Sequence, residues 1–150
     1  MNSWDCFDTL VTRRYLDPLS VFDDMEKKLS LSQFTLKRKS AERRSGANID
    51  CIYEELSKDY GWNIQQSEYY KNEETKAEIE HCCPITQNIN RVEDGDIIVS
   101  DMYLPELTIE KILRKNGLKK DIKIFVSSNG KSSGTIWNKL PKIDLHIGDN

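Results

Sequence analysis

The sequence predicts an α/β protein in which a parallel sheet is interrupted by a helical insertion. Three observations favour this class. In the last third of the chain, short apolar runs alternate with helix patterns in the order β-α-β-α-β, which is typical of a parallel sheet. Another apolar run stands near the start, at residues 2–7. Between residues 15 and 84 no strand pattern appears, and amphipathic helix patterns follow one another.

The first predicted elements are one strand and one helix. Residues 2–7 form the strand, and residues 8–14 form a turn that leads out of it. Asp17 caps the following helix, with Pro18 at its first position, because Asp accepts from free amides and Pro needs no amide partner there. The apolar face of this helix comprises Val21, Phe22, Met25 and Leu29.

Three more helices are expected before the strands resume. The second helix covers residues 32–45 and ends before a glycine. Asp50 caps the third helix, which Gly61 ends. Ser67 caps the fourth, which Pro84 ends.

The last third of the chain supplies the rest of the sheet. Residues 97–100 form a short continuous apolar run, as expected of a buried parallel strand. The first strand joins this sheet across the helices. The prediction is therefore a discontinuous Rossmann-like core at 1–14 and 94–150, with an all-helical insertion at 15–93. The remaining elements of the core are a helix from Pro105 to Gly117, a strand at 122–126, a short helix at 134–140 and a strand at 143–147.

Composition narrows the classes of function. A chain of 150 residues suits one domain, or a domain with an insertion. Its net charge of −3 argues against nucleic acid as the main partner. The basic cluster within residues 37–44 is interpreted as a solvated helix face. Apolar runs are too short to span a membrane, and the start lacks a signal-peptide pattern, so a cytoplasmic location is expected. The four cysteines lack zinc-site spacing and receive no role.

Reactive side chains stand where the predicted strands end. Asp5, Ser100 and Asp149 close three strands, and Lys131 lies in the loop after the strand at 122–126. The carboxyl ends of strands in such sheets meet at one edge, where ligands bind. A carboxylate there can act as a nucleophile or as a ligand of a hard metal ion.

The motifs around these four residues resemble those of the haloacid dehalogenase (HAD) superfamily of Asp-nucleophile hydrolases. A closer similarity is to bacterial HAD-type predicted hydrolases that pair a Phe-Asp-Thr first motif with Ser-Asp-Met-Tyr-Leu. The four matching segments are Asp5-Cys6-Phe7-Asp8-Thr9-Leu10, Ile97-Ile98-Val99-Ser100-Asp101-Met102-Tyr103-Leu104-Pro105, Gly130-Lys131-Ser132-Ser133-Gly134 and His146-Ile147-Gly148-Asp149-Asn150.

This resemblance implies a Mg²⁺-dependent phosphohydrolase that acts on a small phosphorylated metabolite, such as a sugar phosphate. Asp5 would attack phosphorus and form an aspartyl-phosphate, which water would hydrolyse. Ser100 would donate a hydrogen bond to the phosphate, and Lys131 would offset its charge. Mg²⁺ would be bound by Asp5, Asp149 and the backbone carbonyl of Phe7. The helical insertion corresponds to the family's cap, which covers the site and selects the substrate.

Residues near the first motif receive supporting roles. Thr9 would help to fix the loop after Asp5, and Asp8 is interpreted as ordering the turn. Arg13 and Arg14 follow the motif directly. They are candidates for substrate contact, with a surface pair at the hinge of the cap as the other interpretation.

One departure from the family pattern concerns the general acid. Phosphatases of the superfamily usually carry a second Asp two residues after the nucleophile, and Phe7 stands there. Either the proton for the leaving group comes from Asp8, from the cap or from water, or the leaving group needs no proton. Otherwise turnover is slow. Dehalogenases of the superfamily carry an aromatic residue at this position. A metal-independent hydrolytic dehalogenase with Asp5 as nucleophile is therefore an alternative.

A second departure concerns the end of the sequence. The fourth motif normally continues to another acidic residue and a further strand, whereas this sequence stops directly after Asp149. This leaves open whether the chain is a fragment of a longer protein. It also supports another alternative, a non-catalytic HAD-like module that binds or regulates. The oligomeric state is not predicted.

Overall fold

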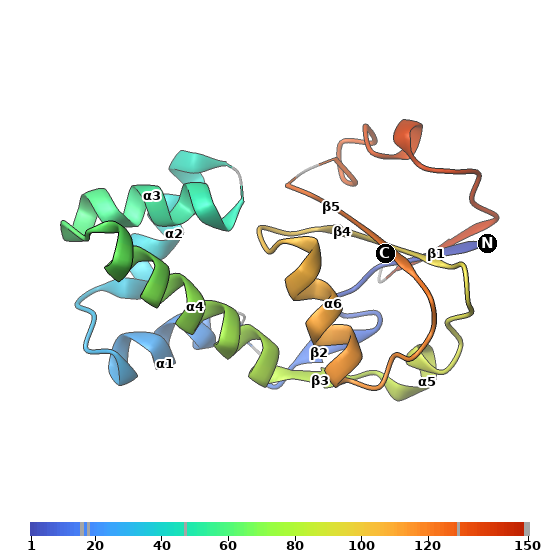
Figure 1. Cartoon of the computed structure of the whole chain (residues 1–150), viewed down its shortest axis with the longest axis horizontal. Coiled ribbons are helices and arrows are strands. Elements are labelled where there is room, and N and C mark those ends of the chain that lie inside the picture. Colours follow the sequence, from blue (N-terminus) through green and yellow to red (C-terminus); the bar gives the residue numbers. More distant parts are fainter. Residues whose placement is uncertain (16, 18, 47, 129, 149–150) are drawn as a thin grey trace. The chain divides into compact units, whose positions relative to one another are not determined.

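The computed structural model describes residues 1–15, 17, 19–46, 48–128 and 130–148. The chain divides into two compact units (Figure 1). One unit combines Met1–Arg14 with Cys82–Asn150, and the other is Tyr15–His81. Residues 82–93 therefore lie with the sheet, whereas the sequence placed them at the end of the helical insertion.

The first unit is built on a four-stranded parallel sheet in the order β5-β4-β1-β6. The strand nearest the N-terminus lies between β4 and β6 and is parallel to both. This confirms the predicted α/β class with a parallel sheet, and the entry of the first strand into it. The strands are β1 (Asn2–Trp4), β4 (Ile97–Asp101), β5 (Lys123–Ser127) and β6 (Leu145–Ile147).

The sheet is covered by one helix and by one irregular segment. The helix α6 (Glu106–Lys115) packs against β5 and buries Ile109, Ile112 and Leu113. Ile97 and Val99 of β4 pack instead against residues of the segment 136–143. Because these side chains alternate along β4, the strand is buried on both faces, as its continuous apolar run predicted.

A buried carboxylate joins the starts of β1 and β4. Asp96 accepts hydrogen bonds from the backbone nitrogen of Asn2 at 2.8 Å and the indole nitrogen of Trp4 at 2.9 Å. It also accepts from the backbone nitrogen of Glu93 at 3.1 Å. Burial by itself raises the pKa of Asp96, but these donors outweigh burial and hold its pKa below the ordinary value.

Three predictions in this unit were wrong. Val11–Arg13 is not part of a turn but a strand, β2, which pairs antiparallel with β3 (Cys82–Pro84). The stretch before residue 84 therefore does contain a strand. Three-residue strands carry too little pattern to identify, because their pairing depends on a partner about 70 residues away. The predicted helix at 134–140 is only a 3₁₀ turn, Trp137–Lys139, and an unexpected short helix, α5, covers Thr86–Ile89.

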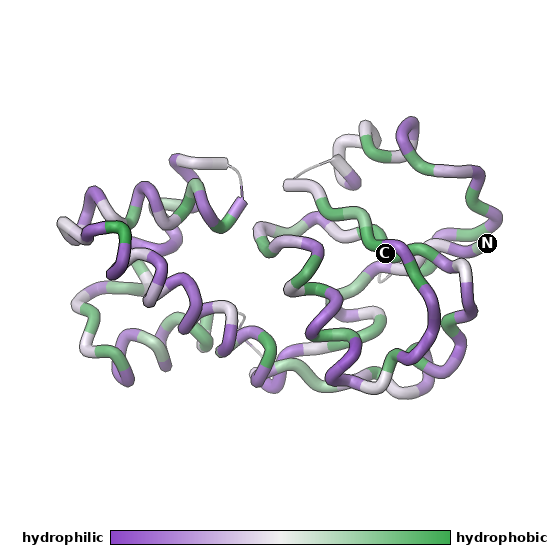
Figure 2. The backbone as a smooth tube through the Cα atoms, viewed as in Figure 1, coloured by the Kyte–Doolittle hydropathy of each residue, from purple (hydrophilic) through white to green (hydrophobic). Residues whose placement is uncertain are grey.

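The second unit is all-helical within its described residues, as predicted. Its helices are α1 (Ser20–Lys28), α2 (Phe34–Ser45), α3 (Ile49–Tyr60) and α4 (Ile64–His81). Figure 2 shows that α4 is hydrophilic along most of its length. Its buried residues are Glu74 and Glu78.

A buried ion pair holds α2 to α4. Arg38 donates to both carboxylate oxygens of Glu74, at 2.7 and 3.0 Å, and neither side chain is exposed. The hydroxyl of Tyr53 donates to the same carboxylate at 3.1 Å. The interpretation of the basic cluster as solvated is therefore wrong for Arg38, which packs over Phe22 with 4.7 Å between the guanidinium carbon and the ring centre.

The helix ends were predicted better than the helix starts. Gly46 and Gly61 end α2 and α3 with φ angles of 58° and 68°, in the left-handed region that glycine adopts at no steric cost. Asn48, not Asp50, caps α3 through a hydrogen bond from the Cys51 amide.

The starts of α4 and α1 also differ from the prediction. Asn63 and Gln66 cap α4 reciprocally, each side chain accepting from the other's backbone amide, so Ser67 is not the cap. Asp17 accepts from the Leu19 amide at 2.9 Å and forms a turn before α1, which begins two residues later than expected. The predicted role of Pro18 lies outside the described residues. No helix in the described part of the chain is both long and apolar enough to cross a membrane.

Candidate active site

A pocket of about 430 Å³ opens at the carboxyl edge of the parallel sheet. Asp5, which directly follows β1, and Ser100 of β4 both line it. Lys131, from the loop after β5, lines it as well. The structure thus brings together three residues that stand 31 to 126 positions apart in the sequence, as expected for strand ends that meet at one edge.

The centre of the pocket is an ion pair. The Nζ atom of Lys131 donates a hydrogen bond to Oδ2 of Asp5, and the two side chains are 14% and 13% exposed. Oδ1 of Asp5 accepts from the Cys6 amide at 2.8 Å. The Asp5 amide in turn donates to the Ile147 carbonyl at 2.8 Å, which ties the residue to the end of β6. The carboxylate is fixed in orientation and still reachable from the pocket.

Asp101 holds the loop that carries Lys131. Its Oδ1 atom accepts from the hydroxyl of Ser127 at 2.7 Å and from the backbone nitrogen of Lys131 at 2.8 Å. Its Oδ2 atom accepts from the backbone nitrogen and the hydroxyl of Ser132, at 2.8 and 2.9 Å. Burial raises the pKa of Asp101, but these four donors outweigh burial and hold its pKa below the ordinary value.

Gly130 is required by the same loop. A Cβ atom at this position would lie 2.7 Å from the hydroxyl oxygen of Ser127, which is too close for any side chain. That hydroxyl also accepts from the Gly130 amide. The sequence motif therefore needs a glycine next to Lys131 for steric reasons.

Ser100 lies in the interior of β4, opposite Val126 of β5. Its side chain is 2% exposed and borders the pocket. A hydroxyl held at the end of a buried strand can donate to an anion bound beside Asp5.

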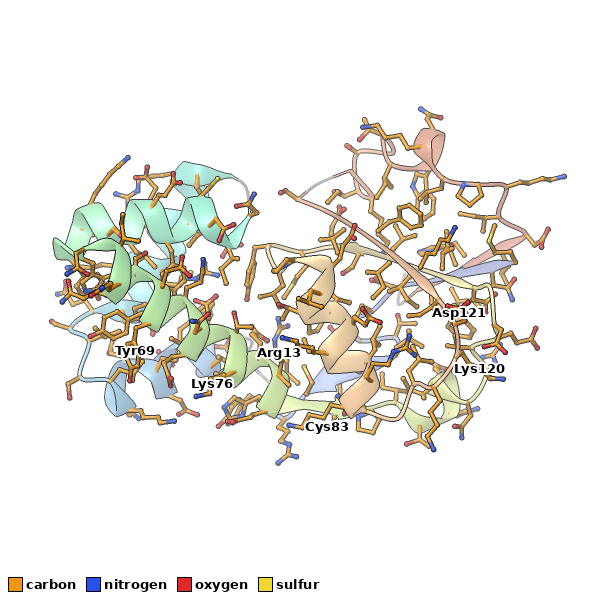
Figure 3. The ribbon with its side chains drawn as sticks, in the orientation of Figure 1. Arg13, Tyr69, Lys76, Cys83, Lys120 and Asp121 are labelled. Carbon is orange, nitrogen blue, oxygen red and sulfur yellow. The ribbon has the colours of Figure 1, made fainter. Side chains whose placement is uncertain are left out.

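Phe7 and Arg13 form another wall of the pocket. The guanidinium carbon of Arg13 lies 4.5 Å from the centre of the Phe7 ring, a cation–π geometry. Arg13, labelled in Figure 3, extends from β2. Arg14 is exposed and does not belong to the described lining of the pocket. Arg13 therefore lines the described pocket and Arg14 does not, and substrate contact by Arg13 stays a prediction.

Thr9 and Asp8 stabilise the turn after Asp5 rather than the pocket. Thr9 is 3% exposed, and its backbone carbonyl accepts from the side chain of Asn88 at 2.8 Å. Asp8 adopts a positive φ of 58°, and its carboxylate accepts from the hydroxyl of Thr12 at 3.1 Å. The Asp8 contact fits its predicted role in ordering the turn. The Thr9 hydroxyl is buried without a hydrogen-bond partner among the described residues, so its predicted role in fixing the loop stays a prediction.

His146 is a pocket residue that the sequence analysis did not select. It lies opposite Ser3 in the sheet, and its Nδ1 atom is 2.7 Å from the Ser3 hydroxyl. Its ring packs edge-on against Trp137, with 4.9 Å between ring centres. Burial lowers the pKa of His146, the charge of Lys131 lowers it further, and Asp5 partly opposes both. Its position in the last predicted strand, two residues before Gly148, could have identified it as a pocket residue, because alternate side chains of a strand share one face.

The proposed metal ligands are only partly described. Asp149 lies outside the described residues. Within the described ranges, no group of three His, Cys, Asp or Glu side chains is arranged to hold a metal ion. Asp5 and the Phe7 carbonyl are oxygen donors, the type that Mg²⁺ prefers, whereas both oxygens of Asp101 are occupied by the loop. The Mg²⁺ site therefore stays a prediction.

No protein-family model matches the sequence, and a comparison with curated proteins gives no match. Function therefore has to be inferred from the chemistry of the pocket.

Proposed function

We propose that the protein is a HAD-like phosphohydrolase, with a Rossmann-like core and the helical unit as its cap. It would use Asp5 as the nucleophile. The observation that carries this proposal is the ion pair between Asp5 and Lys131 at the carboxyl edge of the sheet, with Ser100 in the same pocket. A carboxylate beside a fixed ammonium group is suited to attack on an anionic phosphorus centre, because the cation offsets the charge that both partners bring.

The reaction would proceed in two displacements. In the first, an oxygen of Asp5 attacks phosphorus, the bond to the leaving group breaks, and an aspartyl-phosphate forms. In the second, water attacks the same phosphorus and releases inorganic phosphate and the free carboxylate. Lys131 would stabilise the equatorial oxygens in both steps, and Ser100 would orient them by a hydrogen bond.

Asp5, the Phe7 carbonyl and Asp149 would hold the Mg²⁺ ion. When bound, this ion would supply charge stabilisation as a Lewis acid. Oxygen donors of this kind suit Mg²⁺ better than softer metals. The substrate would be a small phosphorylated metabolite.

Phosphate release tests this proposal directly. Wild type and Asp5→Asn are compared on 4-nitrophenyl phosphate, sugar phosphates and nucleotides, with Mg²⁺ or with EDTA. Asp121→Asn is the matched control, because Asp121 is an exposed carboxylate in a different loop. Activity that needs Mg²⁺, survives in Asp121→Asn and disappears in Asp5→Asn is the expected result. A folded wild-type protein without any phosphate release contradicts it.

Hydrolytic dehalogenation is the second candidate, and the position of Phe7 favours it. Phe7 and Trp137 give the pocket apolar walls, and a halide leaves carbon without taking up a proton. Halide release from 2-haloacids in the presence of EDTA, lost in Asp5→Asn, would identify this reaction. If neither phosphate nor halide is released, a non-catalytic binding or regulatory module remains.

A further inference from the structure

Phe7, two positions after Asp5, has a hydrocarbon side chain that can neither donate nor accept a proton. Phe7 lines the pocket with its ring against the guanidinium group of Arg13. Breaking a bond between phosphorus and an alcohol oxygen normally needs an acid within hydrogen-bond reach of that oxygen. At the position nearest the nucleophile along the chain, the pocket presents a hydrocarbon ring instead.

A second carboxylate that lines the pocket, Asp101, binds Ser127 and the loop that carries Lys131. Asp101 accepts four hydrogen bonds from Ser127, Lys131 and Ser132, two on each oxygen. Protonating either oxygen would break at least one of these bonds. Asp101 is therefore held as a carboxylate, and it cannot donate a proton to a leaving group.

The cationic and imidazole groups are also engaged. The ammonium group of Lys131 donates a hydrogen bond to Asp5. The Nδ1 atom of His146 is bonded to the hydroxyl of Ser3, and burial favours the neutral ring. Among the described residues that line the pocket, Phe7 therefore has no proton to give, and Asp101 is held as a carboxylate by its four hydrogen bonds.

We infer that the enzyme acts on phosphoryl donors whose leaving group departs as a stable anion, above all acyl phosphates. The inference rests on the proposed phosphohydrolase function and names its substrate class. Aryl phosphates are the next best substrates, and phosphate esters of alcohols, including sugar phosphates, are the poorest.

The first step balances without an acid. An oxygen of Asp5 forms the new bond to phosphorus, and the bond between phosphorus and the bridging oxygen breaks. The electron pair of that bond leaves with the bridging oxygen, as a carboxylate from an acyl phosphate or a phenolate from an aryl phosphate. In the second step water attacks phosphorus, its proton is taken up by the phosphate released, and Asp5 returns to the carboxylate form.

A leaving-group series measures this preference. The value of kcat/KM is determined for acetyl phosphate, 4-nitrophenyl phosphate, phenyl phosphate and glucose 6-phosphate, with Mg²⁺ at one pH. General acid catalysis is typically worth about 10² to 10⁴ in rate. We expect kcat/KM to fall by about that factor from acetyl phosphate to glucose 6-phosphate. Equal values for the two, within about tenfold, overturn the inference.

Substitutions of Phe7 test whether the lack of an acid at this position causes the leaving-group preference. Phe7→Asp supplies a carboxyl group beside the nucleophile and is expected to raise the ratio of glucose 6-phosphate to acetyl phosphate turnover at least tenfold. Phe7→Leu is the matched control, because it changes the shape of the wall without adding an acid, and should leave that ratio within about threefold. Equal ratios in the two variants would show that the leaving group is protonated by another residue.

The same measurements distinguish the two proposals from each other. Hydrolysis of every donor at similar rates, abolished by Asp5→Asn, retains the phosphohydrolase and rejects the leaving-group inference. Mass spectrometry of the wild-type protein mixed with acetyl phosphate should detect a phosphoryl adduct on Asp5. Absence of both adduct and turnover with every donor rejects the proposed function, and the inference with it.

Discussion

The backbone nitrogen of Lys131 lies 2.8 Å from Oδ1 of Asp101, a residue 30 positions earlier in the chain. Asp101 directly follows Ser100 on β4, so one strand end both borders the pocket and fixes the loop that delivers the lysine. The position of the ammonium group relative to Asp5 thus depends on Asp101, which binds the backbone of Lys131.

Asp101→Asn should release this loop. An amide group has one acceptor oxygen in place of two, so it cannot accept all four hydrogen bonds from Ser127, Lys131 and Ser132. We expect kcat for phosphate release to fall at least tenfold, with faster hydrogen exchange at the amides of Lys131 and Ser132. Asp94→Asn is the control, because Asp94 does not line the pocket and its carboxylate accepts one hydrogen bond, from the Asp121 amide at 2.8 Å. Unchanged exchange at both loop amides would contradict the assigned role.

Lys131→Met should abolish most of the phosphate release while the protein stays folded. The substitution keeps most of the length of the side chain, which ends one atom short of Nζ, but removes the cation that pairs with Asp5. The expected loss in kcat/KM is about 10² or more, as for removal of one preorganised charge-stabilising group. Lys120→Met, at an exposed position, should retain activity. Full activity in Lys131→Met would contradict a catalytic role for this residue.

The buried carboxylate of Asp96 should make the sheet acid-sensitive. Its pKa in the folded state lies below the ordinary value of 3.8, so its contribution to stability is present above that value. The contribution is lost as the pH falls through 3.8 toward the folded-state pKa. In urea unfolding between pH 7 and 3, Asp96→Asn should be less stable than wild type at pH 7, with a smaller gap at pH 3. A gap that is independent of pH would contradict this.

Glu74→Gln should destabilise the helical unit strongly, because it leaves Arg38 buried without a full counter-charge. Removing one partner of a buried pair costs about 3–5 kcal/mol of unfolding free energy. Asp59→Asn breaks a partly exposed pair with Arg44 and should cost about 1 kcal/mol or less. Urea unfolding of both variants measures the difference, and equal losses would contradict the structural account.

The sequence predicted the parallel sheet and the meeting of Asp5, Ser100 and Lys131, because both follow from strand order and from where strands end. It could not predict that Asp101 would bind the lysine loop, since an Asp after a strand has many local partners. The prediction that Arg38 is solvated was wrong, because α2 and α4 bury the Arg38–Glu74 ion pair, and charged residues in a helix are expected on its exposed face.

Element starts were the least predictable feature. Several polar residues in a row could each cap a helix, and the choice of Asn63 with Gln66 depends on a reciprocal pair of hydrogen bonds. The β2–β3 pairing depends on residues far apart in the chain, which local pattern does not encode.

Cys6, whose amide donates to the Asp5 carboxylate, has a fully buried side chain. Burial is the largest cause that raises the pKa of its thiol, and the neighbouring Cys82 and Asp5 raise it further. The thiolate, which is the form that reacts with alkylating agents and peroxides, is therefore suppressed one residue from the proposed reaction centre. Iodoacetamide should label the half-buried Cys51 and Cys83 before Cys6 in the folded protein. The chemistry at Asp5 would then tolerate oxidative conditions that inactivate hydrolases with a catalytic thiol.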